Sequence, residues 1–214
     1  MKKRLFSLTI IVALFLCSAP SAAVMIYADA DGFSDGTDIS NAFDGMTLSS
    51  TGRASGLDGK VYAKTDAYAS TGTMTFGNNL ANPTLWYLDT HPTTPPHPDD
   101  YALKITFDMP AKYVAIDLVT ESDWSNGSIE SYDSSDNLTF ADYYTWGWNG
   151  EIFRAEISRS SYDIAYVLVG GGLLLPDSVF SVHLDNLSAE IIPEPATILL
   201  LGLGGLALLR RRRS

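Results

Sequence analysis

Four aromatic residues crowd into one short polar stretch, Tyr-Tyr-Thr-Trp-Gly-Trp-Asn-Gly: they are Tyr143, Tyr144, Trp146 and Trp148. Exposed aromatic rings offer flat apolar surfaces for the C–H faces of sugars, and neighbouring polar groups can bind the hydroxyls. The stretch therefore predicts a carbohydrate-binding surface, with Trp124 as a second candidate. In the structural alternative, Tyr144 and Trp146 point inward and form part of a core.

A second group that could do chemistry is acidic and lies near the start of the chain: Asp29, Asp31, Asp35 and Asp38. Calcium takes about six to eight oxygen ligands from carboxylates, carbonyls and water. The spacing does not match the helix–loop–helix calcium site, because Phe33 stands where the third acidic ligand belongs. The cluster is compatible with a structural calcium ion, and the alternative is a set of solvated loop residues.

The histidines and the other acids give less support to zinc binding or catalysis. His91 and His97 precede prolines and His183 is predicted at an outward position of the last strand, so we expect all three to be solvated. A glycosidase needs two carboxyl groups roughly 5 to 10 Å apart. Among 25 acidic residues some pair meets this distance by chance, so the acids alone do not indicate an enzyme.

The elements that must position these residues are predicted to be β-strands. Apolar and polar residues alternate with a period of two over 103–107, 114–118 and 153–157. The turn residues 108–110 and 170–172 are predicted to separate strands, and the proline-rich segment 82–100 to form a long surface loop. Further strands are predicted at 73–76, 127–133, 140–145, 164–169 and 179–187. The pattern predicts an all-β fold, an antiparallel jelly-roll β-sandwich.

The N-terminus has the composition of a secretory signal peptide. A basic start is followed by the apolar run 5–16 and the small residues 21–23, which predicts a leader over 1–23 that is cleaved after Ala23. Cys17, the one cysteine of the chain, falls within this leader. The remaining region is therefore predicted to contain neither a disulfide nor a thiol.

The C-terminus carries three features in order: the motif Pro193, Glu194 and Pro195, the apolar run 196–209, and the basic cluster Arg210, Arg211, Arg212 and Arg213. As a helix the apolar run spans about 21 Å, against roughly 30 Å for the hydrocarbon core of a bilayer. We therefore predict a short transmembrane helix that tethers the chain temporarily, with the arginines on the cytoplasmic side. A permanent C-terminal membrane anchor is the alternative.

The span between the two ends is strongly acidic. Residues 24–195 hold all 25 acidic residues and half of the 14 basic ones, which gives a formal charge of −18. This charge argues against nucleic acid and anionic lipid surfaces as partners. The length of 24–192 suits one domain with a core, flanked by the signal peptide 1–23 and the tail 193–214.

The three-part tail resembles the PEP-CTERM sorting signal of Gram-negative bacteria. The resemblance implies recognition by an exosortase, a membrane-embedded cysteine protease or transpeptidase that would cut at 193–195. It also implies export through the inner membrane, transient insertion by the C-terminal helix, and delivery to the cell surface or the extracellular matrix.

A second resemblance concerns the sandwich. The segments 31–33 with 35–38, 45–49 and 184–187 are similar to the ends of jelly-roll domains in PEP-CTERM proteins. Those domains resemble galactose-binding-like and carbohydrate-binding-module sandwiches, in which a structural calcium bridges the first and last strands; it would map onto Asp31 and Asp185. We therefore expect a non-catalytic surface or matrix protein associated with exopolysaccharide or biofilm. The alternatives are a carbohydrate-binding module that uses the exposed aromatics and a polysaccharide-active enzyme.

Overall fold

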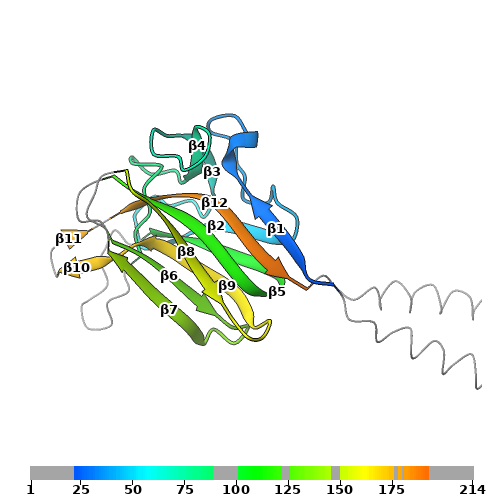
Figure 1. Ribbon diagram of the computed structural model, residues 1–214. Helices are drawn as coiled ribbons and strands as arrows, with labels where there is room; N and C mark the ends of the chain where they lie inside the picture. The colour runs from blue at the N-terminus through cyan, green and yellow to red at the C-terminus, as the bar shows by residue number, and fades with distance from the viewer. Residues whose placement is uncertain are drawn as a thin grey trace, which may run out of the picture. The chain divides into compact units, whose positions relative to one another are not determined.

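The computed structural model of the protein describes residues 22–88, 101–121, 126–145, 150–175, 178–179 and 181–192. This part of the chain consists of antiparallel β-strands with one short 3-10 helix (Figure 1). The elements are β1 (Val24–Ala28), η1 (Ala30–Gly32), β2 (Met46–Gly52), β3 (Tyr62–Thr65), β4 (Met74–Gly77), β5 (Tyr101–Thr120), β6 (Asn126–Tyr132), β7 (Leu138–Thr145), β8 (Ile152–Ser158), β9 (Ile164–Gly171), β10 (Leu173–Leu175), β11 (Ser178–Val179) and β12 (Val182–Ile191).

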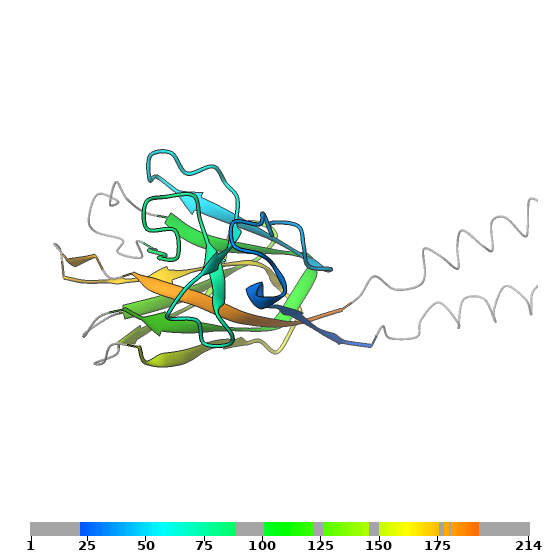
Figure 2. The same cartoon turned by 90° about the horizontal axis from the view of Figure 1, so that it is seen from above.

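The long strand β5 organises the sandwich because its two halves pair with different neighbours. Its first half pairs with β2 and β9, and its second half pairs with β12 and β8. The first layer therefore contains β3, β4, β12, the second half of β5, and β8, with β1 paired to β12. The second layer contains β2, the first half of β5, β9, β6 and β7. Figure 2 shows the blue β1 beside the end of the orange β12.

The strand break predicted at 108–110 is wrong, because β5 runs through these residues without ending. The turn chemistry instead marks the place where β5 changes partners: its register with β9 shifts between Thr106 and Ala111. Pro110 has no N–H to donate to a ladder, which is compatible with an irregular point inside a strand. The paired segments before and after these residues belong to the same strand, so the turn chemistry does not end it.

One hydrophobic core fills the space between the layers. Leu103 and Ile105 from the first half of β5 and Ile116 and Leu118 from its second half are all fully buried in it. In the first half of β5 Ile105 alternates with the more exposed Lys104 and Thr106, which is the period of two seen in the sequence. In the second half every residue from Val114 to Thr120 is buried. The predicted all-β, antiparallel sandwich is confirmed.

The prediction of a surface loop over 82–100 is wrong for its first part. Trp86 and Tyr87 are fully buried, and Trp86 exchanges backbone hydrogen bonds with Val182 of β12. The indole N–H of Trp86 donates to the carbonyl of Phe76 over 2.7 Å. Gly170 makes room for this segment, because a Cβ there would lie 2.8 Å from the backbone nitrogen of Leu88. Gly170 therefore lies within β9 and not in the turn predicted at 170–172.

Residues Met25–Ile191 form one compact unit. The strands β1, β2, β3 and β10 were not predicted from the sequence. Polar and small residues interrupt the hydrophobic pattern of β2 and β3. No helix in the described ranges is long and apolar enough to cross a membrane. The predicted signal-peptide core 5–16 and the apolar run 196–209 lie outside those ranges. The division into the segments 1–23, 24–192 and 193–214 stays a prediction.

Candidate functional site

The strand register places polar residues side by side on the outward side of the first layer. Asp185 of β12 is opposite Asp117 of β5, which is opposite Arg154 of β8. Their neighbours in sequence, such as Leu184, Leu118 and Ala155, point into the core. We call the outward residues His183, Asp185, Ser188, Asp117 and Arg154 the polar face.

Arg154 neutralises one side of this polar face. Its Nη1 donates to Oδ1 of Asp117 over 2.7 Å and to the carbonyl of Asn186 over 2.6 Å, and its Nη2 donates to Oγ of Ser188 over 2.7 Å. The backbone of Asn186 is left-handed, with φ of 48°, at an irregular point of β12 that turns its carbonyl toward the guanidinium. The side chain of Asp117 is only 9% exposed and that of Arg154 is 32% exposed, so the carboxylate of this ion pair is shielded from water.

Residues 66–73, which connect β3 and β4, lie over the polar face and are called the covering loop here. Oγ of Ser70 lies 2.8 Å from Oδ2 of Asp117 and 3.1 Å from Oδ2 of Asp185. The backbone N–H of Thr71 donates to Oδ2 of Asp185 over 2.9 Å. Burial raises the pKa of Asp185, and the nearby Asp29 adds to the rise, although hydrogen bonds from Thr71, Asn186 and Ser70 oppose it.

The end of the covering loop is bound by Asp31 of η1. Its Oδ1 accepts hydrogen bonds from the backbone N–H groups of Thr73 over 2.8 Å and Met74 over 3.0 Å. Gly72 makes this contact possible, since it has φ of +52° and a Cβ there would lie 1.9 Å from Asp31 Oδ2. Asp29 also reaches the loop, with Oδ2 3.4 Å from Oγ1 of Thr71.

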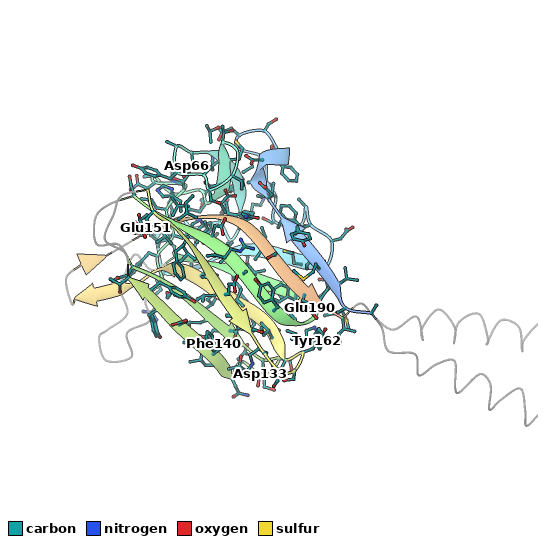
Figure 3. The ribbon with its side chains drawn as sticks, in the orientation of Figure 1. Asp66, Asp133, Phe140, Glu151, Tyr162 and Glu190 are labelled. Carbon is teal, nitrogen blue, oxygen red and sulfur yellow. The ribbon has the colours of Figure 1, made fainter. Side chains whose placement is uncertain are left out.

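His183 anchors the beginning of the covering loop. Its Nδ1 lies 2.5 Å from Oδ2 of Asp66, which is labelled in Figure 3, and the ring of Tyr68 stacks on the imidazole with centroids 4.8 Å apart. Burial acts to raise the pKa of Asp66, but the hydrogen bonds with His183 and with the N–H of Tyr68 outweigh it and hold the pKa below its usual value. Nε2 of His183 is buried and has no hydrogen-bond partner in the described part of the chain.

The prediction that His183 is solvated is therefore wrong, although its outward position on the strand is right. Only 3% of the residue is exposed, because the covering loop packs on it. No local sequence pattern predicts this contact, since Asp66 and His183 are 117 positions apart. A run of alternating residues shows which side of a strand a residue takes but not what later covers that side.

The structure brings both residues of the predicted calcium pair to this loop. Asp31 and Asp185 bind adjacent parts of it, and β1, which precedes Asp31, pairs with β12, which holds Asp185. Within the described ranges, no three His, Cys, Asp or Glu residues form a group that could hold a metal ion. Calcium binding by Asp31 and Asp185 stays a prediction.

The predicted carbohydrate-binding residues are described only in part. Tyr143 on β7 is 56% exposed, whereas Tyr144 packs on Phe153 with ring centroids 4.2 Å apart and lies against the core. Burial raises the pKa of Tyr144 to about 12. These two tyrosines therefore lie on opposite sides of β7. The other three candidates lie outside the described residues: Trp124, Trp146 and Trp148.

More tyrosines lie on the outward side of the second layer, where Tyr143 is opposite Ser128. Tyr132 of β6 and Tyr166 of β9 stack in parallel with centroids 4.8 Å apart, and Nζ of Lys104 lies 3.9 Å from the Tyr166 centroid. The hydroxyl of Tyr132 donates to Glu130 over 2.5 Å. Burial, and to a smaller extent this hydrogen bond, raises the pKa of Tyr132 well above its usual value. We call Lys104, Tyr132, Tyr143 and Tyr166 the tyrosine face; its stacked pair was not predicted.

Comparison of the chain with known protein families finds a match at its C-terminus. The sequence profile of the PEP-CTERM protein-sorting motif matches residues 192–213. The chain therefore carries a PEP-CTERM sorting motif, which confirms the resemblance seen in its sequence and indicates export and sorting to the cell surface. No curated protein gives a significant match to the chain. The sorting residues themselves lie outside the described part of the structure: Pro193, Glu194, Pro195, Arg210, Arg211, Arg212 and Arg213.

Two solved structures are similar to the chain at low identity. TmCBM61, determined in complex with beta-1,4-galactotriose, is 10% identical, with 69% of this chain and 84% of that chain covered and a TM-score of 0.32. The enzymatically active domain of bacteriophage CBA120 tailspike protein 4 is 15% identical, with 76% of this chain and 21% of that chain covered and a TM-score of 0.30. With TM-scores this low, neither likeness carries an argument about what this chain binds or does.

Proposed function

We propose that the chain is an exported, non-catalytic surface or matrix protein that an exosortase releases from the membrane by cutting at Pro193–Glu194–Pro195. The observation that supports this proposal most is the sorting motif at 192–213, which follows directly on the last strand of the sandwich. The signal peptide predicted over 1–23 supplies the matching start of an export route. Insertion of the apolar run 196–209 into the inner membrane is transient in this scheme.

The burial and the hydrogen bonds of Asp117 and Asp185 support a non-catalytic function. Asp117 and Asp185 are adjacent, as a glycosidase requires, yet both are buried and bound by the covering loop. Arg154 and Asn186 take further lone pairs of Asp117. Carboxylates whose lone pairs are occupied by protein donors serve the fold, since a catalytic acid must reach the substrate within about 3 Å.

The test is expression of the full chain in Gram-negative cells with and without an exosortase, followed by mass spectrometry of the C-terminus. We expect a new C-terminus within 193–195 only when the enzyme is present. The triple alanine variant of Pro193, Glu194 and Pro195 is the matched control and should keep its tail through Ser214. An intact tail in the wild-type chain beside an active exosortase would contradict the proposal.

Carbohydrate binding by the tyrosine face is the second candidate function. Tyr143 exposes 56% of its surface on the same side of the second layer as the Tyr132–Tyr166 stack and the ammonium group of Lys104. Rings and a cation on one side of a sheet suit the C–H faces and oxygen atoms of a polysaccharide. The association with exopolysaccharide that we propose for this protein would use this side.

A glycan array with the exported protein tests this second function. Tyr143→Ala should weaken binding at least severalfold, whereas Tyr27→Ala should not, because Tyr27 is 67% exposed on β1 of the other layer. Equal loss in both variants, or no bound glycan for the wild-type protein, would reject the tyrosine face as the site. A hydrolysis assay on each bound glycan should release no product if the protein is non-catalytic.

A further inference from the structure

The last strand is firmly held up to its final residue. Ile191 is opposite Ala111 of β5 and is only 6% exposed. Next to it, Oε1 of Glu190 accepts a hydrogen bond of 2.6 Å from the hydroxyl of Tyr162, and both residues are labelled in Figure 3. On the other side β12 pairs with β1, and a Cβ on Gly45 would lie 3.0 Å from Cδ1 of Ile191 and 3.5 Å from Cδ1 of Ile26.

The sorting motif begins without a linker. The matched segment starts at residue 192, directly after the last residue of β12. The proposed cleavage region at 193–195 is therefore two to four residues beyond Ile191. Even when fully extended, so few residues reach only about 7 to 14 Å from the strand end.

Because the cleavage region lies so close to the folded strand, a peptide-cleaving enzyme has little room to bind it. The reacting carbonyl must meet a nucleophile and oxyanion donors at about 3 Å, in a site that excludes water. Extended peptides are commonly held by main-chain hydrogen bonds like those of an added strand. In the folded sandwich, however, the main chain just before the motif is already paired with β5, and neighbouring strands about 4.8 Å away occupy the same space.

We propose that cleavage at the sorting motif requires residues 188–191 of β12 to detach from β5 and β1, so that the folded sandwich is a poor substrate and the enzyme acts on the open strand end. Local openings of this kind have free energies between zero and the global stability, and strand ends lie at the low side of that range. The rate of release then depends on how firmly the end of β12 is held. This inference rests on the proposed exosortase cleavage and adds the step that limits its rate, which is the opening of the end of β12.

Two changes to the full chain test this proposal, with tail loss followed by mass spectrometry in cells that contain an exosortase. A six-residue Gly/Ser linker inserted between Ile192 and Pro193 leaves the sandwich intact and should raise the cleavage rate severalfold. The matched control is the same linker inserted after Gly56, in an exposed turn where the surroundings are open. It should leave the rate unchanged.

The second change locks the strand end. Glu190 and Tyr113 are opposite each other in the register, and facing residues of antiparallel strands have Cα atoms about 4.5 to 5.5 Å apart, which suits a disulfide. The double variant Tyr113→Cys and Glu190→Cys should be cut severalfold more slowly than either single variant. Adding the Gly/Ser linker to the locked variant should restore cleavage.

The outcomes separate this inference from the function it rests on. Cleavage of the wild-type chain at a rate that neither the linker nor the lock changes would overturn the requirement for strand opening and leave the sorting function in place. Absence of cleavage in every variant, the linker variant included, would overturn the proposed cleavage together with this inference.

Discussion

Asp185 lies directly opposite Asp117 in the β12–β5 register, and the hydroxyl of Ser70 lies within hydrogen-bonding distance of both carboxylates. Two acids so close would repel each other if both were charged and unpartnered. Here Arg154 neutralises Asp117, and the N–H groups of Thr71 and Asn186 bind Asp185. The polar face thus fixes the covering loop by charge, by hydrogen bonds and by the stacking of Tyr68 on His183.

This arrangement predicts how stability depends on pH. The pKa of Asp185 is raised by burial, so the folded state binds its proton more tightly than the unfolded state. The resulting stabilisation is present below the unfolded pKa of about 3.9 and is lost as the pH rises through the folded value. Urea unfolding from about pH 4 to 7 should therefore show the wild-type protein losing stability relative to Asp185→Asn. A constant difference between the two proteins would contradict the raised pKa.

Asp38 should make stability depend on pH in the opposite direction, because its pKa is lowered and not raised. Its pKa is lowered to about 2, first by the side chain of Lys60 and then by Ser40. The stabilisation that it contributes is present above the unfolded pKa and is lost as the pH falls toward 2. Since the Lys60–Asp38 pair is largely exposed, Asp38→Asn should have a small effect that salt weakens, measured by thermal unfolding at two ionic strengths.

Gly72→Ala is expected to damage the contact between the covering loop and η1. The new Cβ would lie 1.9 Å from a carboxylate oxygen of Asp31, in a backbone conformation that L-residues disfavour. We expect a loss of about 3 kcal/mol in the free energy of unfolding, from strain and from weakened hydrogen bonds to Asp31. Gly56→Ala is the matched control: it also has a positive φ but open surroundings, and it should lose only about 1–2 kcal/mol. Equal losses would show that Asp31 contributes nothing.

Arg154→Met removes the partner of a shielded carboxylate. Asp117 would keep Ser70 and Asn186 but lose its counter-ion, so we expect a loss of about 2–3 kcal/mol in chemical denaturation. Arg159→Met is the comparison, because Arg159 pairs with Asp163 where about a third of each side chain is exposed. That variant should lose at most about 1 kcal/mol. A larger loss for Arg159→Met would mean that the Arg154 contacts are not the main support of this face.

The calcium predicted at Asp31 and Asp185 can be tested by chelation. An ion that binds only the folded state stabilises it by mass action, so EDTA should lower the melting temperature and added calcium should restore it. Magnesium, which demands a smaller octahedral site, should not replace calcium. An unchanged melting curve would mean that the hydrogen bonds from Thr71, Thr73 and Met74 satisfy these carboxylates without a metal.

The strands that alternate strongly were predictable, but their connections were not. Residues 103–107 and 114–118 show the period of two, yet only the pairing with β2, β9, β12 and β8 reveals that they belong to one strand. Trp86 sits in a proline-rich segment that locally has the composition of a loop, and its burial depends on β12 and on Gly170. Such long-range contacts leave no pattern in neighbouring residues.

For the candidate sites too, the types of the residues could be predicted from the sequence, whereas contacts between residues far apart in the chain could not. A resemblance between sequences predicts Asp31 and Asp185, and in the structure both bind the covering loop. The Tyr132–Tyr166 stack joins strands whose register the sequence does not specify. Tyr143 could be chosen as an aromatic residue, but its exposure depends on its position on the outward side of β7.

The sharing of β5 by both layers has a consequence for how the sandwich can fail. Leu103 and Leu118 belong to one strand, so neither layer can come apart without disturbing a strand that the other layer shares. We therefore expect the two layers to unfold together as one cooperative unit, apart from local openings such as that of the end of β12. For a protein that works outside the cell, beyond the reach of chaperones, this leaves no long-lived half-folded form to be degraded or to aggregate.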